Sequence, residues 1–154
     1  MKSTSCRLYV SSCILAIVSA IPLASFAAAP EPCELLTLAD VRAALGAQWT
    51  HNAKFSEGEV CAYQAAAVAA VSILLTSDAA GAASILAGRR QLAGSKATAA
   101  PGPGDGAYFV DTPWAIAIVF GKGDWVAQIE ATPAATRDRA VLEKLAQAAY
   151  GRLP

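Results

Sequence analysis

The chain has 154 residues, and its 12 Lys plus Arg balance 12 Asp plus Glu. This length fits one small domain. Alanine supplies 37 positions and accounts for much of the 55% hydrophobic fraction, so the composition does not require a membrane protein. Charged residues make up only 16% and form no basic run, which argues against a nucleic-acid-binding surface.

Residues 1–27 have the pattern of a secretory signal peptide. Lys2 and Arg7 provide a positive start, residues 8–23 are mostly apolar, and small residues lie around a cleavage position near Ala27. Serines and a proline interrupt the apolar segment, which is short for a membrane span of about 20 residues. A cleaved signal peptide is therefore favoured over an uncleaved membrane anchor.

Lipid attachment is not expected either. Cys13 falls inside the apolar segment and Cys33 follows Pro30-Glu31-Pro32, so neither cysteine stands in a lipidation motif. Removal of residues 1–27 leaves ten basic and twelve acidic residues, and a net charge of 10 − 12 = −2 is too small to select a partner by sign. We expect a single domain over residues 28–154, periplasmic or secreted, with no stable membrane span.

Two cysteines, Cys33 and Cys61, remain in the mature chain. In an oxidising compartment the simplest interpretation is a disulfide that closes a loop of about 29 residues. The alternative is a redox-active or metal-binding pair assisted by His51, the only histidine. The spacing is not Cys-x-x-Cys, so we expect a disulfide, no metal and no cofactor.

The first half of the mature chain predicts one helix followed by three strands. Thr37 and Asp40 have the spacing of a capping box, and Gly46 is a typical helix end. Alternating apolar residues and a polar turn then indicate a hairpin and a further strand. The predicted elements are a helix over residues 38–45 and strands over residues 49–55, 60–64 and 68–76.

The second half repeats this order. Asp78 begins a second helix that Gly94 ends, and the Pro- and Gly-rich segment 95–106 predicts a loop. Residues 121–124, Gly-Lys-Gly-Asp, are typical of a turn. The predicted elements are a helix over residues 78–94, strands over residues 107–111, 114–120 and 125–131, and a helix over residues 136–150 that stops at Gly151.

The order helix, three strands, helix, three strands, helix predicts an α+β two-layer sandwich with a largely antiparallel sheet. Large residues at 114, 116, 118 and 120 alternate with small ones, so we expect the helices to cover the large-residue face alone. The opposite face is expected to be smooth and modestly polar. Gln128 and Glu130 lie on it, which makes it a candidate binding surface.

Several short motifs occur in order along the mature chain. They are Pro32-Cys33-Glu34-Leu35-Leu36-Thr37, Ala44-Leu45-Gly46, Cys61-Ala62-Tyr63, Gly104-Asp105-Gly106-Ala107-Tyr108-Phe109 and Gly121-Lys122-Gly123-Asp124. With this order the chain resembles a group of small exported bacterial domains of unknown function, many of them actinobacterial lipoproteins. The resemblance spans residues 32–150 and implies a compact α/β domain outside the cytoplasm with bridged cysteines. It implies no catalytic residue, and the chain lacks the lipidation motif of the lipoprotein members.

Residues with catalytic potential are few. The glycine-rich segment 102–106 lacks the Lys-Ser/Thr ending of a phosphate-binding loop, and no nucleophile motif accompanies His51. Asp105, Asp111 and Asp124 would form a carboxylate pair or a calcium site if their loops met at one end of the sheet. Solvated turn residues are the simpler interpretation of these aspartates.

Trp49, Trp114 and Trp125 belong either to the core or to an aromatic binding patch. With no convergent catalytic set, the favoured hypothesis is a non-enzymatic exported module that binds a protein, an envelope component or a small ligand. One alternative is an inhibitor or immunity-type protein that docks on an exported hydrolase. The other is a small hydrolase that uses the loop carboxylates.

Overall fold

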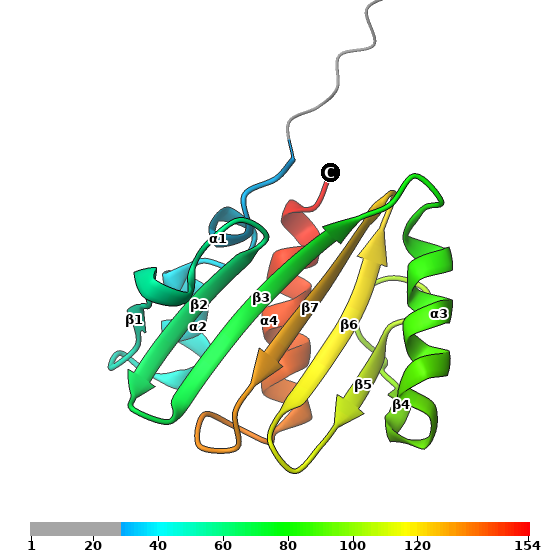
Figure 1. Ribbon diagram of the computed structural model, residues 1–154. Coiled ribbons are helices and arrows are strands. Elements are labelled where there is room, and N and C mark those ends of the chain that lie inside the picture. Colours follow the sequence, from blue (N-terminus) through cyan, green and yellow to red (C-terminus); the bar gives the residue numbers. More distant parts are fainter. Residues whose placement is uncertain (1–28) are drawn as a thin grey trace, which may run out of the picture.

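The computed structural model describes residues 29–154, and the predicted signal peptide lies outside the described residues. Figure 1 shows an antiparallel sheet of seven strands combined with four α-helices, which confirms the predicted α+β class. No helix within residues 29–154 has the length and apolar character needed to cross a membrane.

The helices are α1 (Pro32–Leu35), α2 (Leu38–Leu45), α3 (Ala82–Ala93) and α4 (Arg139–Arg152), with short 3-10 helices η1 (Ala53–Phe55) and η2 (Gly94–Lys96). The strands are β1 (Thr50–His51), β2 (Val60–Ala66), β3 (Ala69–Ser77), β4 (Ala97–Ala99), β5 (Tyr108–Asp111), β6 (Ile116–Lys122) and β7 (Trp125–Ala131).

The strand order across the sheet is β1-β2-β3-β7-β6-β5-β4. Each half of the chain therefore builds one side of the sheet, and the halves meet where β3 pairs with β7 over seven residue pairs, such as Ile73 with Ile129. Because strand side chains alternate between faces, this register places Ile73 and Ile129 together on one side.

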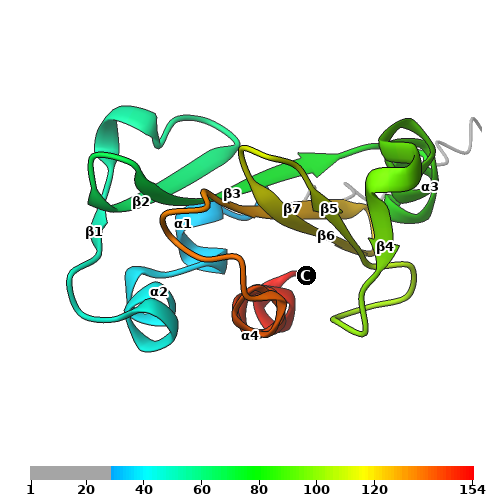
Figure 2. The same ribbon diagram turned by 90° about the horizontal axis from the view of Figure 1, so that it is seen from below.

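Three helices, α1, α2 and α4, cover the core-facing side of the sheet (Figure 2). Their apolar residues pack against inward side chains of both sheet halves, including Ile118 and Phe120 of β6 and Leu142 and Leu145 of α4. All four of these side chains are at most 1% exposed. This is the continuous hydrophobic core of the domain.

Helix α3 lies on the opposite side of the sheet, so the expectation that all helices cover one face is wrong. Its Ala82 and Leu86 pack against Val119 and Val126, which point away from the main core. Close approach depends on Gly121, where an added Cβ would lie 2.7 Å from the Cβ of Ala82 and 3.0 Å from Leu86. The alternating side chains of β6 thus contact α4 on one face of the sheet and α3 on the other.

Several predicted boundaries also differ from the structure. The predicted strand 49–55 is reduced to two residues, because η1 replaces its end and turns the chain toward the outward side of the sheet. Part of the expected loop 95–106 forms the edge strand β4. Helix α3 begins after a turn that Asp78 caps, and α4 begins after its own cap, Asp138, and continues through Gly151.

The predicted disulfide joins Cys33 of α1 to Cys61 of β2, with a Cα–Cα distance of 5.1 Å. Helix α1 has only four residues and could not persist alone. The disulfide, with the burial of Leu35 and Leu36, attaches this helix to the sheet.

A second connection joins helix α2 to the C-terminal helix α4. The capping box of α2 is present, with Asp40 accepting hydrogen bonds from the backbone and hydroxyl of Thr37. The same carboxylate accepts hydrogen bonds from Arg152 of α4 at 2.7 and 3.1 Å. These interactions, led by Arg152, lower the pKa of Asp40 from its usual 3.8 to about 2.

Replacing either cysteine tests the disulfide. We expect Cys33→Ala or Cys61→Ala to lower the free energy of unfolding by about 3.5 kcal/mol, the chain-entropy value for a loop of about 29 residues. The double variant should be no less stable than the less stable of the two single variants, because each substitution already removes the same disulfide bond. Urea unfolding measures this, and additive losses would contradict the disulfide.

Replacing Asp40 tests the ion pair with Arg152. We expect Asp40→Asn to cost about 1 kcal/mol at pH 7, since both groups are partly exposed and solvent weakens the pair. The folded pKa lies below the unfolded value, so the native stabilisation is present above about pH 3.8 and is lost as pH falls toward 2.

Urea unfolding of both proteins at pH 7 and near pH 2 should therefore show a stability difference that is much smaller in acid, where the Asp40 carboxyl is partly protonated in the folded protein. Glu34→Gln, which removes an exposed acid from α1, is the matched control and should change stability little at either pH. A difference for Asp40→Asn that persists undiminished at pH 2 would contradict the role of the charge.

Candidate binding face

Among residues 29–154, no α-helix covers the outward side of β2, β3 and the adjoining part of β7. Helix α3 lies over β6 and β7 instead (Figure 2), while η1 contacts β2. We call this surface the outer face. It carries small and polar side chains together with one leucine: Ala62, Gln64, Ala70, Ser72, Leu74, Thr76, Gln128 and Glu130.

A hollow of about 410 Å³ lies on the outer face beside η1, and we call it the η1 groove. Phe55 of η1 is 62% exposed and forms part of its wall. Ala62 and Ala70 contribute small apolar surfaces, while Asn52 and Gln64 add amide groups. The groove thus combines an apolar surface with a few hydrogen-bonding groups, the usual chemistry of a small-ligand site.

The position of η1 follows from a short network of hydrogen bonds to β2. The hydroxyl of Ser56 donates to the Asn52 carbonyl and accepts from the amide of Ala62, both at 2.9 Å. The amide of Asn52 donates to the Ala62 carbonyl at 2.8 Å, and its side chain donates to Gln64 at 2.7 Å. These contacts hold the groove wall in place before any ligand binds.

Gln128 and Glu130 lie on the outer face, as the strand alternation predicted. Their side chains are 3.3 Å apart, with the Gln128 amide donating to the Glu130 carboxylate. Ser72 pairs with Glu130 across β3 and β7. At the border with α3, the guanidinium of Arg89 donates to Thr76 at 2.9 Å and closes that side of the face.

The three tryptophans do not gather into a patch. Trp49 is 2% exposed in the core, and Trp125 packs against the edge of the same core. Trp114 is 80% exposed in the turn between β5 and β6, at the end of β6 opposite to Trp125. Trp114 is therefore the most exposed of the three and Trp125 is partly buried, although Trp114 was expected on the large-residue face of the sheet.

The Trp114 turn is firmly held. Arg137 forms an ion pair with Asp111 at 2.9 Å and donates to the carbonyl oxygens of Thr112 and Pro113. The Thr112 hydroxyl also caps the turn by donating to the carbonyl of Ala115. An exposed aromatic side chain on a rigid turn is a typical anchor of a protein interface.

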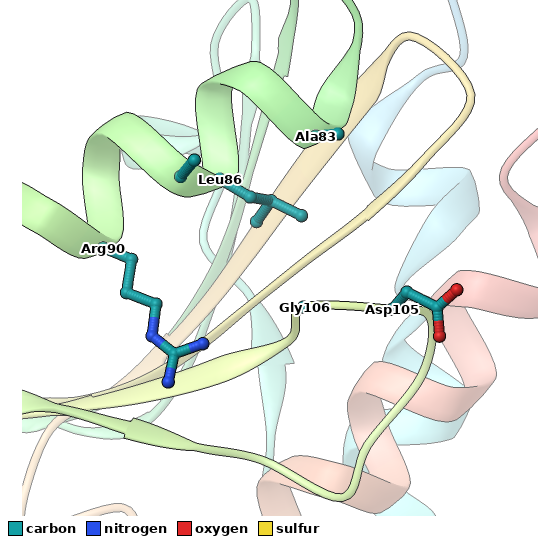
Figure 3. Close-up of a pocket in the computed structure, with 6 residues that line it drawn as sticks. Ala83, Leu86, Arg90, Asp105 and Gly106 are labelled. Carbon is teal, nitrogen blue, oxygen red and sulfur yellow. The ribbon is translucent and has the colours of Figure 1, made fainter.

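The three aspartates do not converge. Asp111 lies at the β5–β6 turn with Arg137, whereas Asp105 and Asp124 lie toward the opposite end of the sheet. Figure 3 shows Asp105 on the loop before β5, beside a shallow hollow of about 330 Å³ that Leu86 and Arg90 of α3 also line. Asp124 lies in the turn that follows β6. Asp111 therefore does not share a site with Asp105 and Asp124.

Within residues 29–154, the one cluster of three potential metal ligands consists of Cys33, His51 and Cys61. Their donor atoms lie within 4.8 Å of one another, and the Cys33 sulfur is 3.6 Å from Nε2 of His51. Behind them, Tyr63 donates its hydroxyl to the Leu36 carbonyl. Burial raises the pKa of Tyr63 to about 12, so this phenol is neutral at physiological pH.

Comparison of the chain with protein-family models, with curated proteins and with solved structures finds no match. The function must therefore be inferred from the surfaces described above.

The sequence predicted the outer face but not the η1 groove. Alternation through residues 49–55 indicated a strand, and a strand would have left Phe55 in the sheet. The one local signal was the Asn52 and Ser56 pair, since both residue types compete with a strand for backbone hydrogen bonds. The proximity of His51 to the cysteines had no local signal, because α1 and β1 are distant in sequence.

Single replacements distinguish the tryptophans. We expect Trp49→Ala to destabilise the protein by about 3–5 kcal/mol, because it empties a buried site. Trp114→Ala should change the free energy of unfolding by less than about 0.5 kcal/mol, since its indole is mostly in solvent. Thermal or urea unfolding measures both, and a large loss for Trp114→Ala would show an unrecognised structural role.

Proposed function

We propose that this chain is an exported, disulfide-stabilised binding module without catalytic chemistry of its own, related to the lipoprotein-type domains that it resembles. Export is supported by the signal-peptide pattern of residues 1–27 and by the disulfide, which persists in oxidising compartments. The mature protein would then be periplasmic or secreted.

The η1 groove carries the proposal for the binding site. Its volume of about 410 Å³ lies in the range of small-ligand sites, about 300–1,000 Å³. Phe55 supplies an exposed apolar wall, and the amides of Asn52 and Gln64 supply donors and acceptors. The ligand class that fits best is a small amphiphile, or a short peptide side chain, with an apolar part and one hydrogen-bonding group.

The Trp114 turn supports a second hypothesis, docking on a partner protein such as an exported hydrolase. Trp114 is exposed and Arg137 fixes the turn that carries it. Both hypotheses describe a binding protein and differ in the surface used. The hydrolase alternative is limited to Asp105 and Asp124, because Asp111 lies at the other end of the sheet in an ion pair with Arg137.

Ligand titration followed by the amide signals of the ¹⁵N-labelled protein tests the proposed site. A library of small amphiphiles and short peptides should perturb the signals of Gln64 and Ser72. Ser72→Arg should weaken binding of any such ligand by at least about tenfold, or about 1.4 kcal/mol, because the long side chain enters the groove. Ser72 is only partly buried on the outer face, so folding should be preserved.

The matched control is Ser84→Arg, which adds the same side chain to an exposed position of α3 and should leave binding unchanged. Perturbations centred on the Trp114 turn would favour the protein-docking hypothesis instead. An absence of saturable perturbation anywhere on the outer face would contradict the proposed groove.

A further inference from the structure

Three separate elements bring two cysteines and a histidine together at the edge of the sheet. Cys33 comes from α1 and is exposed, Cys61 comes from β2 and is fully buried, and His51 comes from the exposed edge strand β1. Pairing of β1 with β2 sets His51 beside Tyr63, and Cys61 lies two residues before it. The sheet register therefore positions His51 next to the disulfide.

We propose that reduction of the disulfide converts this cluster into a Cys2His site for a thiophilic divalent cation, with Zn²⁺ as the best match. Thiolate and imidazole are the ligands that Zn²⁺ prefers, and the donor atoms already lie within 4.8 Å of one another. The two cysteines then either form the disulfide or bind the metal. This inference does not depend on what the η1 groove binds.

One of the three distances between donor atoms already fits a tetrahedral ion. With Zn–S of about 2.3 Å and Zn–N of about 2.0–2.1 Å, a tetrahedral angle places sulfur and nitrogen roughly 3.6 Å apart. The observed separation of the Cys33 sulfur and Nε2 of His51 is 3.6 Å. The two sulfurs must separate to roughly 3.8 Å, a shift that falls to Cys33, because its side chain is exposed on a four-residue helix.

The chemical balance requires a reductant, which we identify as a dithiol. A dithiol transfers two electrons and two protons to the disulfide, its own sulfurs become a disulfide, and Cys33 and Cys61 become thiols. The exposed Cys33 sulfur is the accessible point of attack, so the Cys61 thiolate leaves first. Binding of Zn²⁺ then releases the two thiol protons.

Three protein ligands leave a fourth coordination position. Because Cys33 and His51 are exposed, that position faces solvent and would take water or a small exogenous ligand. An open fourth position distinguishes exchangeable and catalytic zinc sites from closed structural ones. The reduced protein would therefore bind a metal that other ligands can reach.

Cobalt titration tests the site directly. The mature protein, residues 28–154, in which Cys33 and Cys61 are the two cysteines, is reduced with a tertiary phosphine, which water converts to the phosphine oxide, and Co²⁺ is added without competing thiols. We expect one equivalent to produce thiolate-to-cobalt charge-transfer absorption and the d–d bands of a tetrahedral ion, with native circular dichroism. Zn²⁺ should displace Co²⁺ and raise the melting temperature of the reduced protein but not of the oxidised protein.

Variants identify the ligands. His51→Ala should weaken Co²⁺ affinity by at least about tenfold, the lower limit for loss of even an outer-shell partner. Thr50→Ala, on the other side of His51 in β1, is the matched control and should retain the affinity, because Thr50 is exposed and lies outside the η1 groove. Cys33→Ser should abolish the charge-transfer band or reduce it to that of one thiolate.

Three results would overturn the proposal. Reduced protein that binds no Co²⁺, whether it remains folded or unfolds, excludes the site. Binding with equal affinity in His51→Ala excludes the histidine as a ligand, and binding of Co²⁺ by the oxidised protein at this stoichiometry places the metal elsewhere.

Discussion

The pairing of β3 with β7 is the interaction on which the rest of the domain depends. Seven residue pairs join the two halves of the chain at the middle of the sheet, so a single register decides which side chains face the core on both sides. A slip of β3 by one residue against β7 would turn Ile73 outward and Ser72 inward while Ile129 still faced the core. The apolar core and the polar outer face are thus two consequences of one alignment.

The outer face and the cysteine cluster lie close together but are organised by different contacts. Hydrogen bonds from Asn52 and Ser56 to β2 hold the groove wall, whereas the disulfide and the core hold α1. Because His51 and Asn52 are neighbours, the β1–η1 segment takes part in both regions. The proposed ligand and the proposed metal would therefore meet a common element without sharing a single side chain.

Local signals made part of this structure predictable. The capping box of Thr37 and Asp40 and the end at Gly46 gave helix α2 its correct bounds, and two remaining cysteines left one possible intrachain bridge. The rest depends on distant contacts. The chain leaves the strand conformation at Asn52, whose side chain donates a hydrogen bond to Gln64 of β2. The side of the sheet that α3 covers depends on its packing against Val119 of β6. Neither arrangement can be predicted from the neighbouring residues alone.

Gly121 was predicted to belong to a turn, yet it lies within β6, and its missing side chain is what lets α3 rest on the sheet. How closely α3 packs against the sheet therefore depends on the absence of a side chain at Gly121. A methyl group at this position would push the helix outward, expose apolar residues such as Val119 and Val126, and merge two regions that are now distinct. The same glycine that lets α3 approach the sheet thus helps to determine which part of that side the helix covers.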